Sequence, residues 1–115
     1  MGAKARPALD GLAAGELDAL RLSSQVLAHK AALAGSSRVE MFFTSVEAEV
    51  AAETAARGQR GQRGANSADP WRTAPLSPTD RATIRAYLEL LRDNERLSPA
   101  VREYVRQLIA AGRVS

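Results

Sequence analysis

The chain has 115 residues, of which 45% are hydrophobic and only 4% are aromatic. This length suits a single domain. Because much of the hydrophobic fraction is alanine, we expect a core with few large side chains. An oligomer or a partner could supply the missing buried surface. The sequence contains no cysteine, which excludes disulfides and cysteine-ligated zinc. The absence of cysteine fits a reducing cytoplasm, so we expect a cytoplasmic protein. The sequence also has no run of about 18 apolar residues that would span a membrane.

Residues 1–12 are predicted to form a disordered tail, because Gly11 and Gly15 weaken an early helix start. From residue 13 to residue 34, hydrophobic residues recur at helical spacing on two nearly opposite arcs. One arc comprises Leu17, Leu20, Ser24, Leu27, Ala28 and Ala31, and the other comprises Leu22, Val26 and Leu33. Two apolar arcs are typical of a helix sandwiched between two neighbours, which are either the rest of its own domain or a second subunit.

A second helix is predicted from Ser37 to about residue 57. Gly35 favours the left-handed end of the first helix, and Ser37 with Glu40 has the pattern of a capping box. The clearest core stripe of the chain follows, formed by Val39, Phe42, Phe43, Val46 and Val50.

Residues 58–76 are predicted to be a flexible basic linker. The segment begins with a three-residue repeat in which Arg57, Arg60 and Arg63 alternate with glycine and glutamine. Its glycines and prolines argue against a regular element. A long structureless loop within a compact domain indicates disorder or function, and we expect residues 59–68 to be mobile.

Two further helix starts share one design. Ser77-Pro78 and Ser98-Pro99 each place serine at the N-cap and proline at the first helical position. We expect helices over residues 78–95 and 99–111, the second ended by Gly112. Their predicted core residues are Ile84, Tyr87, Leu88 and Leu91 in the first, and Val101, Tyr104, Val105 and Leu108 in the second.

These elements predict an all-α fold, a small helical bundle in one compact domain. Residues 13–57 form an N-terminal helical hairpin, and residues 77–115 form a C-terminal helical hairpin. The flexible loop joins the two hairpins, and no sheet is expected because no run of alternating β-branched residues occurs.

The sequence offers little to catalysis. His29 is the only histidine, and a single histidine beside an apolar stripe is usually structural. The phosphate-binding and nucleophile motifs are absent, and so is the glutamate-histidine pairing of helical di-iron sites. Glu49 and Glu53 lie one helical turn apart, as expected for a solvated face. We therefore expect no enzyme activity, no metal, no cofactor and no small-molecule substrate.

The arginine-glycine repeat is the first candidate for binding. Arg57, Arg60 and Arg63 stand in a segment of low steric restriction, which can lay guanidinium groups along phosphates or in a narrow minor groove. The repeat resembles the arginine-glycine segments of RNA-binding proteins. Residues 57–75 carry a net charge of +3 and residues 36–56 carry −3, so mutual neutralisation within a plain linker is the alternative.

The C-terminal segment carries a second candidate. Val101-Arg102, Val105, Leu108 and Gly112 have a spacing that resembles the recognition helix of winged helix-turn-helix regulators, over residues 97–114. The resemblance implies DNA binding, with Arg102, Arg106 and Arg113 on one arc facing the major groove. An ordinary amphipathic hairpin explains the same pattern.

Two functions follow as hypotheses. The first is a small regulatory protein that acts through protein–protein contacts of its apolar helix faces, as a homodimer that pairs Leu22, Val26 and Leu33 across a two-fold axis. The alternative is a nucleic-acid-binding regulator that uses the arginine-glycine loop and the arginine face of the last helix.

Overall fold

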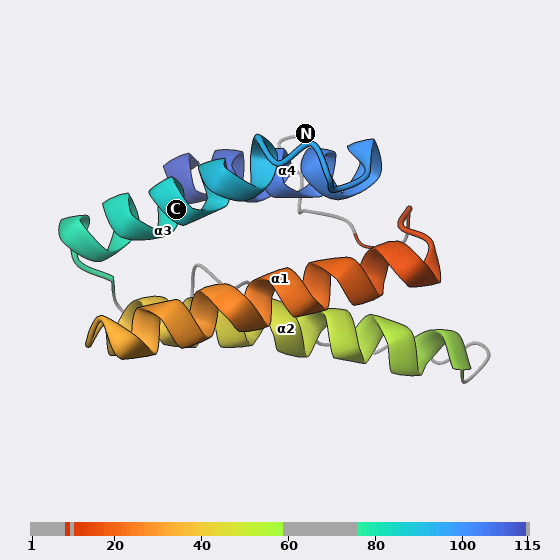
Figure 1. Ribbon diagram of the computed structural model, residues 1–115, viewed down its shortest axis with the longest axis horizontal. Helices are drawn as coiled ribbons and strands as arrows, with labels where there is room; N and C mark the ends of the chain where they lie inside the picture. The colour runs from red at the N-terminus through yellow and green to blue at the C-terminus, as the bar shows by residue number, and fades with distance from the viewer. Residues whose placement is uncertain (1–8, 10, 59–75, 115) are drawn as a thin grey trace.

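The computed structural model describes residue 9, residues 11–58 and residues 76–114. Four helices follow one another: α1 (Ala14–Leu33), α2 (Ser37–Gly58), α3 (Pro78–Arg92) and α4 (Pro99–Val114). Helices α1 and α2 pack as one hairpin, α3 and α4 pack as another, and the second hairpin lies on the first as a separate layer (Figure 1). The all-α fold of two hairpins is therefore confirmed, and the described residues contain no strand.

The turn between α1 and α2 follows from Gly35. Its φ of 79° is in the left-handed region that glycine favours. The amide of Ser36 donates to the carbonyl of Ala31 at 2.9 Å, which satisfies an end carbonyl of α1. The predicted cap at Ser37 is wrong by one residue, because α2 already begins there and Glu40 donates its amide to the carbonyl of Ser36.

The helix starts of the second hairpin are as predicted. The hydroxyl of Ser77 accepts from the amide of Asp80 at 3.1 Å, and the Asp80 carboxylate accepts from the amide of Ser77. The hydroxyl of Ser98 accepts from the amide of Val101 at 3.3 Å. Both predicted ends are wrong. Helix α3 stops at Arg92, where the chain enters the turn to α4. Helix α4 continues through Gly112, which keeps a negative φ and whose carbonyl accepts from Arg81.

The core lies between the two layers. The predicted stripe of α2 is fully buried, and so are the predicted core residues of α3 and α4 except Tyr87, which is half-buried. The rings of Phe42 and Phe43 meet edge to face, with centroids 5.0 Å apart, and Phe43 lies 5.9 Å from Tyr87 on α3. These aromatic contacts join α2 to the second layer.

The segment before α1 also enters the core. Leu9 and Leu12 are buried, and the amide of Leu12 donates to the carbonyl of Leu9. The predicted disordered tail over residues 1–12 is therefore wrong for these two leucines. They add apolar burial that helical periodicity could not reveal, because they stand outside any helix.

A polar contact ties the two layers at the N-terminus of α1. One oxygen of the Glu16 carboxylate accepts from the amide of Ala13 at 2.7 Å. The hydroxyl of Ser98, at the start of α4, donates to the same carboxylate. The bond from Ala13, followed by the bond from Ser98, lowers the pKa of Glu16 from its ordinary value.

This contact predicts a pH dependence of stability. A depressed folded-state pKa contributes stability that is present above the unfolded pKa and is lost as the pH falls through the folded pKa. We expect the melting temperature of Glu16→Gln to fall less than that of the wild type between about pH 6 and pH 3. Glu95→Gln, in the exposed turn before α4, is the control. Equal pH profiles for wild type and Glu16→Gln would contradict the prediction.

Candidate functional site: two interaction surfaces

The described residues hold no assembled site for metal chemistry. In this part of the chain, no group of three or more histidine, cysteine, aspartate or glutamate side chains could hold a metal ion. His29, the only histidine, is exposed on α1. None of the helices in the described ranges is long and apolar enough to cross a membrane.

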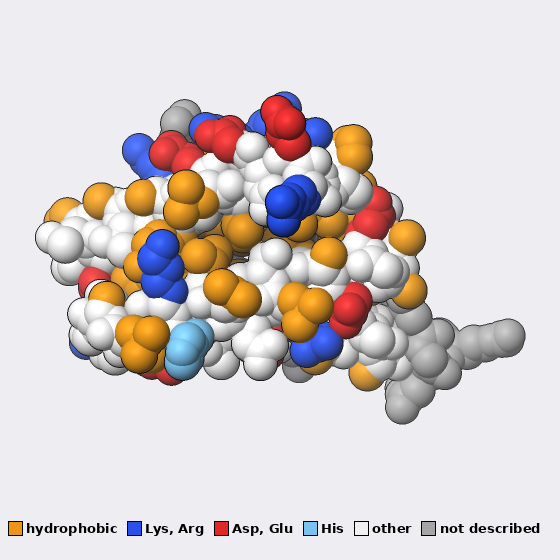
Figure 2. Space-filling model, viewed as in Figure 1, with side chains coloured by type: hydrophobic (Ala, Val, Ile, Leu, Met, Phe, Trp, Pro, Cys, Tyr) orange, Lys and Arg blue, Asp and Glu red, His pale blue; other side chains and the backbone are white. Residues whose placement is uncertain are grey.

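The first surface is the outer face of α1. The arc of Leu17, Leu20 and Leu27 faces the core, which leaves the opposite arc in solvent. The exposed fractions of Leu22, Val26 and Leu33 are 47%, 64% and 77%. Neither α2 nor the second layer therefore covers this arc, and we call it the outer α1 face. Figure 2 shows hydrophobic side chains exposed over the lower layer, whose front is α1.

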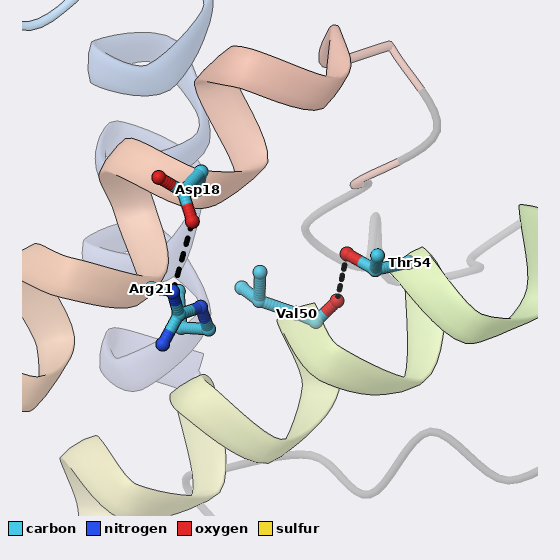
Figure 3. A network of polar contacts seen from close by, with 4 residues as sticks. All are labelled: Asp18, Arg21, Val50 and Thr54. Atoms are coloured by element: carbon cyan, nitrogen blue, oxygen red, sulfur yellow. Dashed lines mark hydrogen bonds and ion pairs between the residues drawn. The ribbon is translucent and has the colours of Figure 1, made fainter.

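Charged residues border the outer α1 face. Arg21 donates to the carboxylate of Asp18 at 2.9 Å, and both side chains are partly exposed (Figure 3). On α2, which packs against α1, the hydroxyl of Thr54 donates to the carbonyl of Val50 one turn earlier (Figure 3). Toward the other end of α1, the ammonium group of Lys30 lies 5.4 Å from the ring centre of Tyr87. Among the residues that the structure describes, the other large exposed hydrophobic side chains are Met41 on α2 and Leu90 on α3.

The second surface contains two of the six predicted arginines. Arg106 is 66% exposed and pairs with Glu103 at 3.4 Å. Arg102 is half-buried, and its Nε atom has no hydrogen-bond partner within the described part of the chain. Arg57 and Arg113 stand in the last turns of α2 and α4, but their side chains lie outside the described residues, as do Arg60 and Arg63 entirely.

Helix α3 contributes further arginines, which were not among the binding residues predicted from the sequence. Arg81 donates from Nη1 to the carbonyl of Gly112 at 3.2 Å. Arg81 and Arg85 line a small pocket between α3 and α4, together with Ile109 and Gly112. Arg102, Arg106 and Ile109 share one face of α4, because they are spaced by four and three residues.

The other end of this hairpin is also basic. Arg92 donates to the carboxylate of Asp93 at 3.1 Å. The hydrogen bond from Arg92, with the charges of Arg92 and Arg102, lowers the pKa of Asp93. Arg102 stands in the first turn of α4, just after the short turn that contains Asp93. We call the row Arg81, Arg85, Arg92, Arg102 and Arg106 the arginine seam.

The signal for the seam was present in the sequence. Arg81, Arg85 and Arg92 are spaced by four and seven residues, which puts them on one helical face. Their relation to Arg102 and Arg106 depends on the packing of α3 against α4, which the arginine pattern of α4 alone does not give. The resemblance to a recognition helix stays a prediction. Comparison of the chain with family models, curated proteins and solved structures gave no match.

Proposed function

We propose that this chain is a cytoplasmic, non-enzymatic helical protein that acts through protein–protein contacts and binds a second copy of itself through the outer α1 face. The observation that supports this is the exposure of Leu22, Val26 and Leu33 on the side of α1 opposite its core. Large apolar side chains that recur along one face of a helix mark an interaction surface more clearly than scattered ones do.

The free-energy gain favours pairing. Complete burial of a leucine or valine side chain contributes about 1.5–3 kcal/mol relative to full exposure, and the three side chains of this face are about half to three-quarters exposed. A two-fold axis lets one such face cover an identical one, so that two copies suffice for closure.

The self-association is tested by light scattering across micromolar concentrations. The wild type should approach the mass of a dimer as its concentration rises, and Val26→Glu should stay a monomer. Because Val26 is 64% exposed, this variant should keep its helical circular dichroism. Ala86→Glu adds the same charge at an exposed position of α3, away from the outer α1 face, and should still dimerise. A wild type that is monomeric at every concentration would overturn the proposal.

A second candidate function is nucleic-acid binding through the arginine seam. Guanidinium groups donate in a planar fork that matches phosphate oxygens. Within the described part of the chain, Arg85 is exposed and forms no ion pair. The pairs of Arg92 with Asp93 and Arg106 with Glu103 are solvent-accessible, and such pairs contribute only about 0–1 kcal/mol. Phosphates can therefore compete for these arginines at low cost.

The shape of the seam favours an extended polyanion. Arg81 and Arg92 are eleven residues apart on one helix, which corresponds to about 16 Å. That length covers about five base-pair steps at 3.4 Å each. The seam combines this length with arginines from two adjacent helices, so it fits a sugar-phosphate backbone better than a single phosphate.

Fluorescence anisotropy with a labelled DNA duplex tests this candidate. The apparent association constant should fall linearly with salt on logarithmic axes. The double variant Arg85→Gln/Arg106→Gln should reduce the magnitude of this slope by about two. Arg21→Gln on α1, which removes one arginine outside the seam, is the control and should leave the slope unchanged.

Three results would contradict the seam. The first is no binding to the duplex at about 50 mM salt, where phosphate contacts are strong. The second is loss of binding in Arg60→Gln/Arg63→Gln while Arg85→Gln/Arg106→Gln binds normally. The third is equally tight binding to poly-glutamate, which would identify an acidic protein segment as the partner.

A further inference from the structure

The outer α1 face continues beyond its three large apolar residues. Six positions recur at alternating spacings of four and three residues: Gly15, Ala19, Leu22, Val26, His29 and Leu33. This is the spacing of the contact seam in a two-stranded coiled coil. None of the six carries a formal charge at pH 7 with histidine neutral. All are exposed except Ala19, which is half-buried and packs against the core at the edge of the row.

The row is graded in size from one end to the other. Gly15 and Ala19 stand near the start of α1, and His29 and Leu33 stand near its end. A Cβ atom at Gly15 would have no heavy atom within 4 Å, so this end of the row borders open space. A parallel partner in register would place glycine against glycine and leucine against leucine. An antiparallel partner would place large side chains against small ones.

We propose that two copies pair their α1 helices antiparallel in one register, with Gly15 opposite the partner's Leu33, Ala19 opposite the partner's His29, and Leu22 opposite the partner's Val26. This inference rests on the self-association proposed above and specifies its geometry. The two-fold axis passes between Leu22 and Val26, and the side chain of Leu33 fills the space beside the glycine of the other copy. Helix α1 therefore supplies both halves of its own complementary surface.

The charges that flank the row agree with this register. In an antiparallel pair, each flank of one helix faces the same flank of the other. On one flank this register brings Glu16 toward the partner's Lys30, once on each side of the axis. The residues that face themselves near the axis are Ser23 and Gln25, which carry no charge. Asp18 faces the partner's Ala32, so no like charges oppose each other on either flank.

Cross-linking tests the register, because the chain has no cysteine and any introduced one is unique. Gln25→Cys should give a covalent dimer with a short bismaleimide, since the two copies of residue 25 lie near the axis. Leu33→Cys alone should not, because its two copies are about 27 Å apart along the helices. A mixture of Gly15→Cys and Leu33→Cys should cross-link between the two variants.

Size and charge variants give a second readout by sedimentation. Gly15→Leu should weaken the dimer at least tenfold, because the added side chain occupies the place of the partner's Leu33. The same variant should not unfold the monomer, because the space beside Gly15 is open. Lys30→Glu should weaken the dimer, because it places two carboxylates opposite each other on each side of the axis.

The outcomes separate the register from self-association itself. A dimer by light scattering in which Leu33→Cys alone cross-links and Gln25→Cys does not would overturn the antiparallel register and leave self-association standing. A dimer that Gly15→Leu strengthens would also overturn the register. A wild type that never dimerises would overturn both proposals.

Discussion

Phe43→Ala should lower the free energy of unfolding by about 3–5 kcal/mol, the usual cost of removing a fully buried phenylalanine ring. The ring is 0% exposed, packs edge-on against Phe42, and lies near Tyr87 of the other layer. Its loss leaves a cavity at the junction of α2 and α3.

Urea denaturation at a fixed protein concentration measures this effect. Phe42→Ala, whose ring is 1% exposed, should cost a similar amount. Met41→Ala on the same helix is the matched control, because Met41 is 45% exposed and surface changes usually stay within about 0.5 kcal/mol. A Phe43→Ala midpoint equal to that of the wild type would mean that the ring is not buried in solution.

Ser24→Ala should raise the free energy of unfolding by about 1–3 kcal/mol. Ser24 is 1% exposed on the core face of α1, and its hydroxyl has no hydrogen-bond partner within the described part of the chain. Burying an unpartnered hydroxyl costs about 1–3 kcal/mol by mutational measurements. Alanine removes the hydroxyl, keeps the small volume that α1 needs beside α2, and has the higher helix propensity.

Thermal denaturation separates the gain from removing the buried hydroxyl from the gain in helix propensity. Ser23→Ala, at the neighbouring half-buried position, measures the gain from helix propensity alone. Ser24→Ala should exceed it by several degrees, because about 1 kcal/mol shifts the melting temperature of a domain this size by roughly 4 °C. A destabilised Ser24→Ala would contradict this and show that the hydroxyl is hydrogen-bonded in solution, as serine hydroxyls in helices often are to the carbonyl one turn earlier.

The regular parts of the fold could be predicted from the sequence because their signals are local. Ser77 and Gly35 each act on backbone groups within a few residues of themselves, and the structure places both as predicted. The burial of Leu9 and Leu12 depends on where distant helices leave room. The end of α4 beyond Gly112 is likewise linked to a distant residue, since Arg81 of α3 donates to the glycine carbonyl.

The candidate surfaces could likewise be predicted only in part, because one part of their signal is local and the other depends on tertiary packing. Periodicity identified both apolar arcs of α1, but it could not decide which one the core would bury. Packing against α2 settles this, because the arc of small residues Ser24, Ala28 and Ala31 allows the two helices to approach closely and leaves Val26 in solvent. The arginine seam needed tertiary contacts as well, because Arg81 and Arg85 meet α4 only in the folded hairpin.

The division into two hairpins also determines how the chain should fold. Contacts within each hairpin join residues that are close in sequence. Contacts between the layers form only when the two ends of the connecting segment, Gly58 and Pro78, are held in place relative to each other. Local contacts form fast and with little loss of chain entropy. The layers should therefore dock after each hairpin has begun to form. Tyr87→Ala removes a side chain through which α3 contacts α2. This variant should unfold faster than the wild type, and its refolding rate should be nearly unchanged.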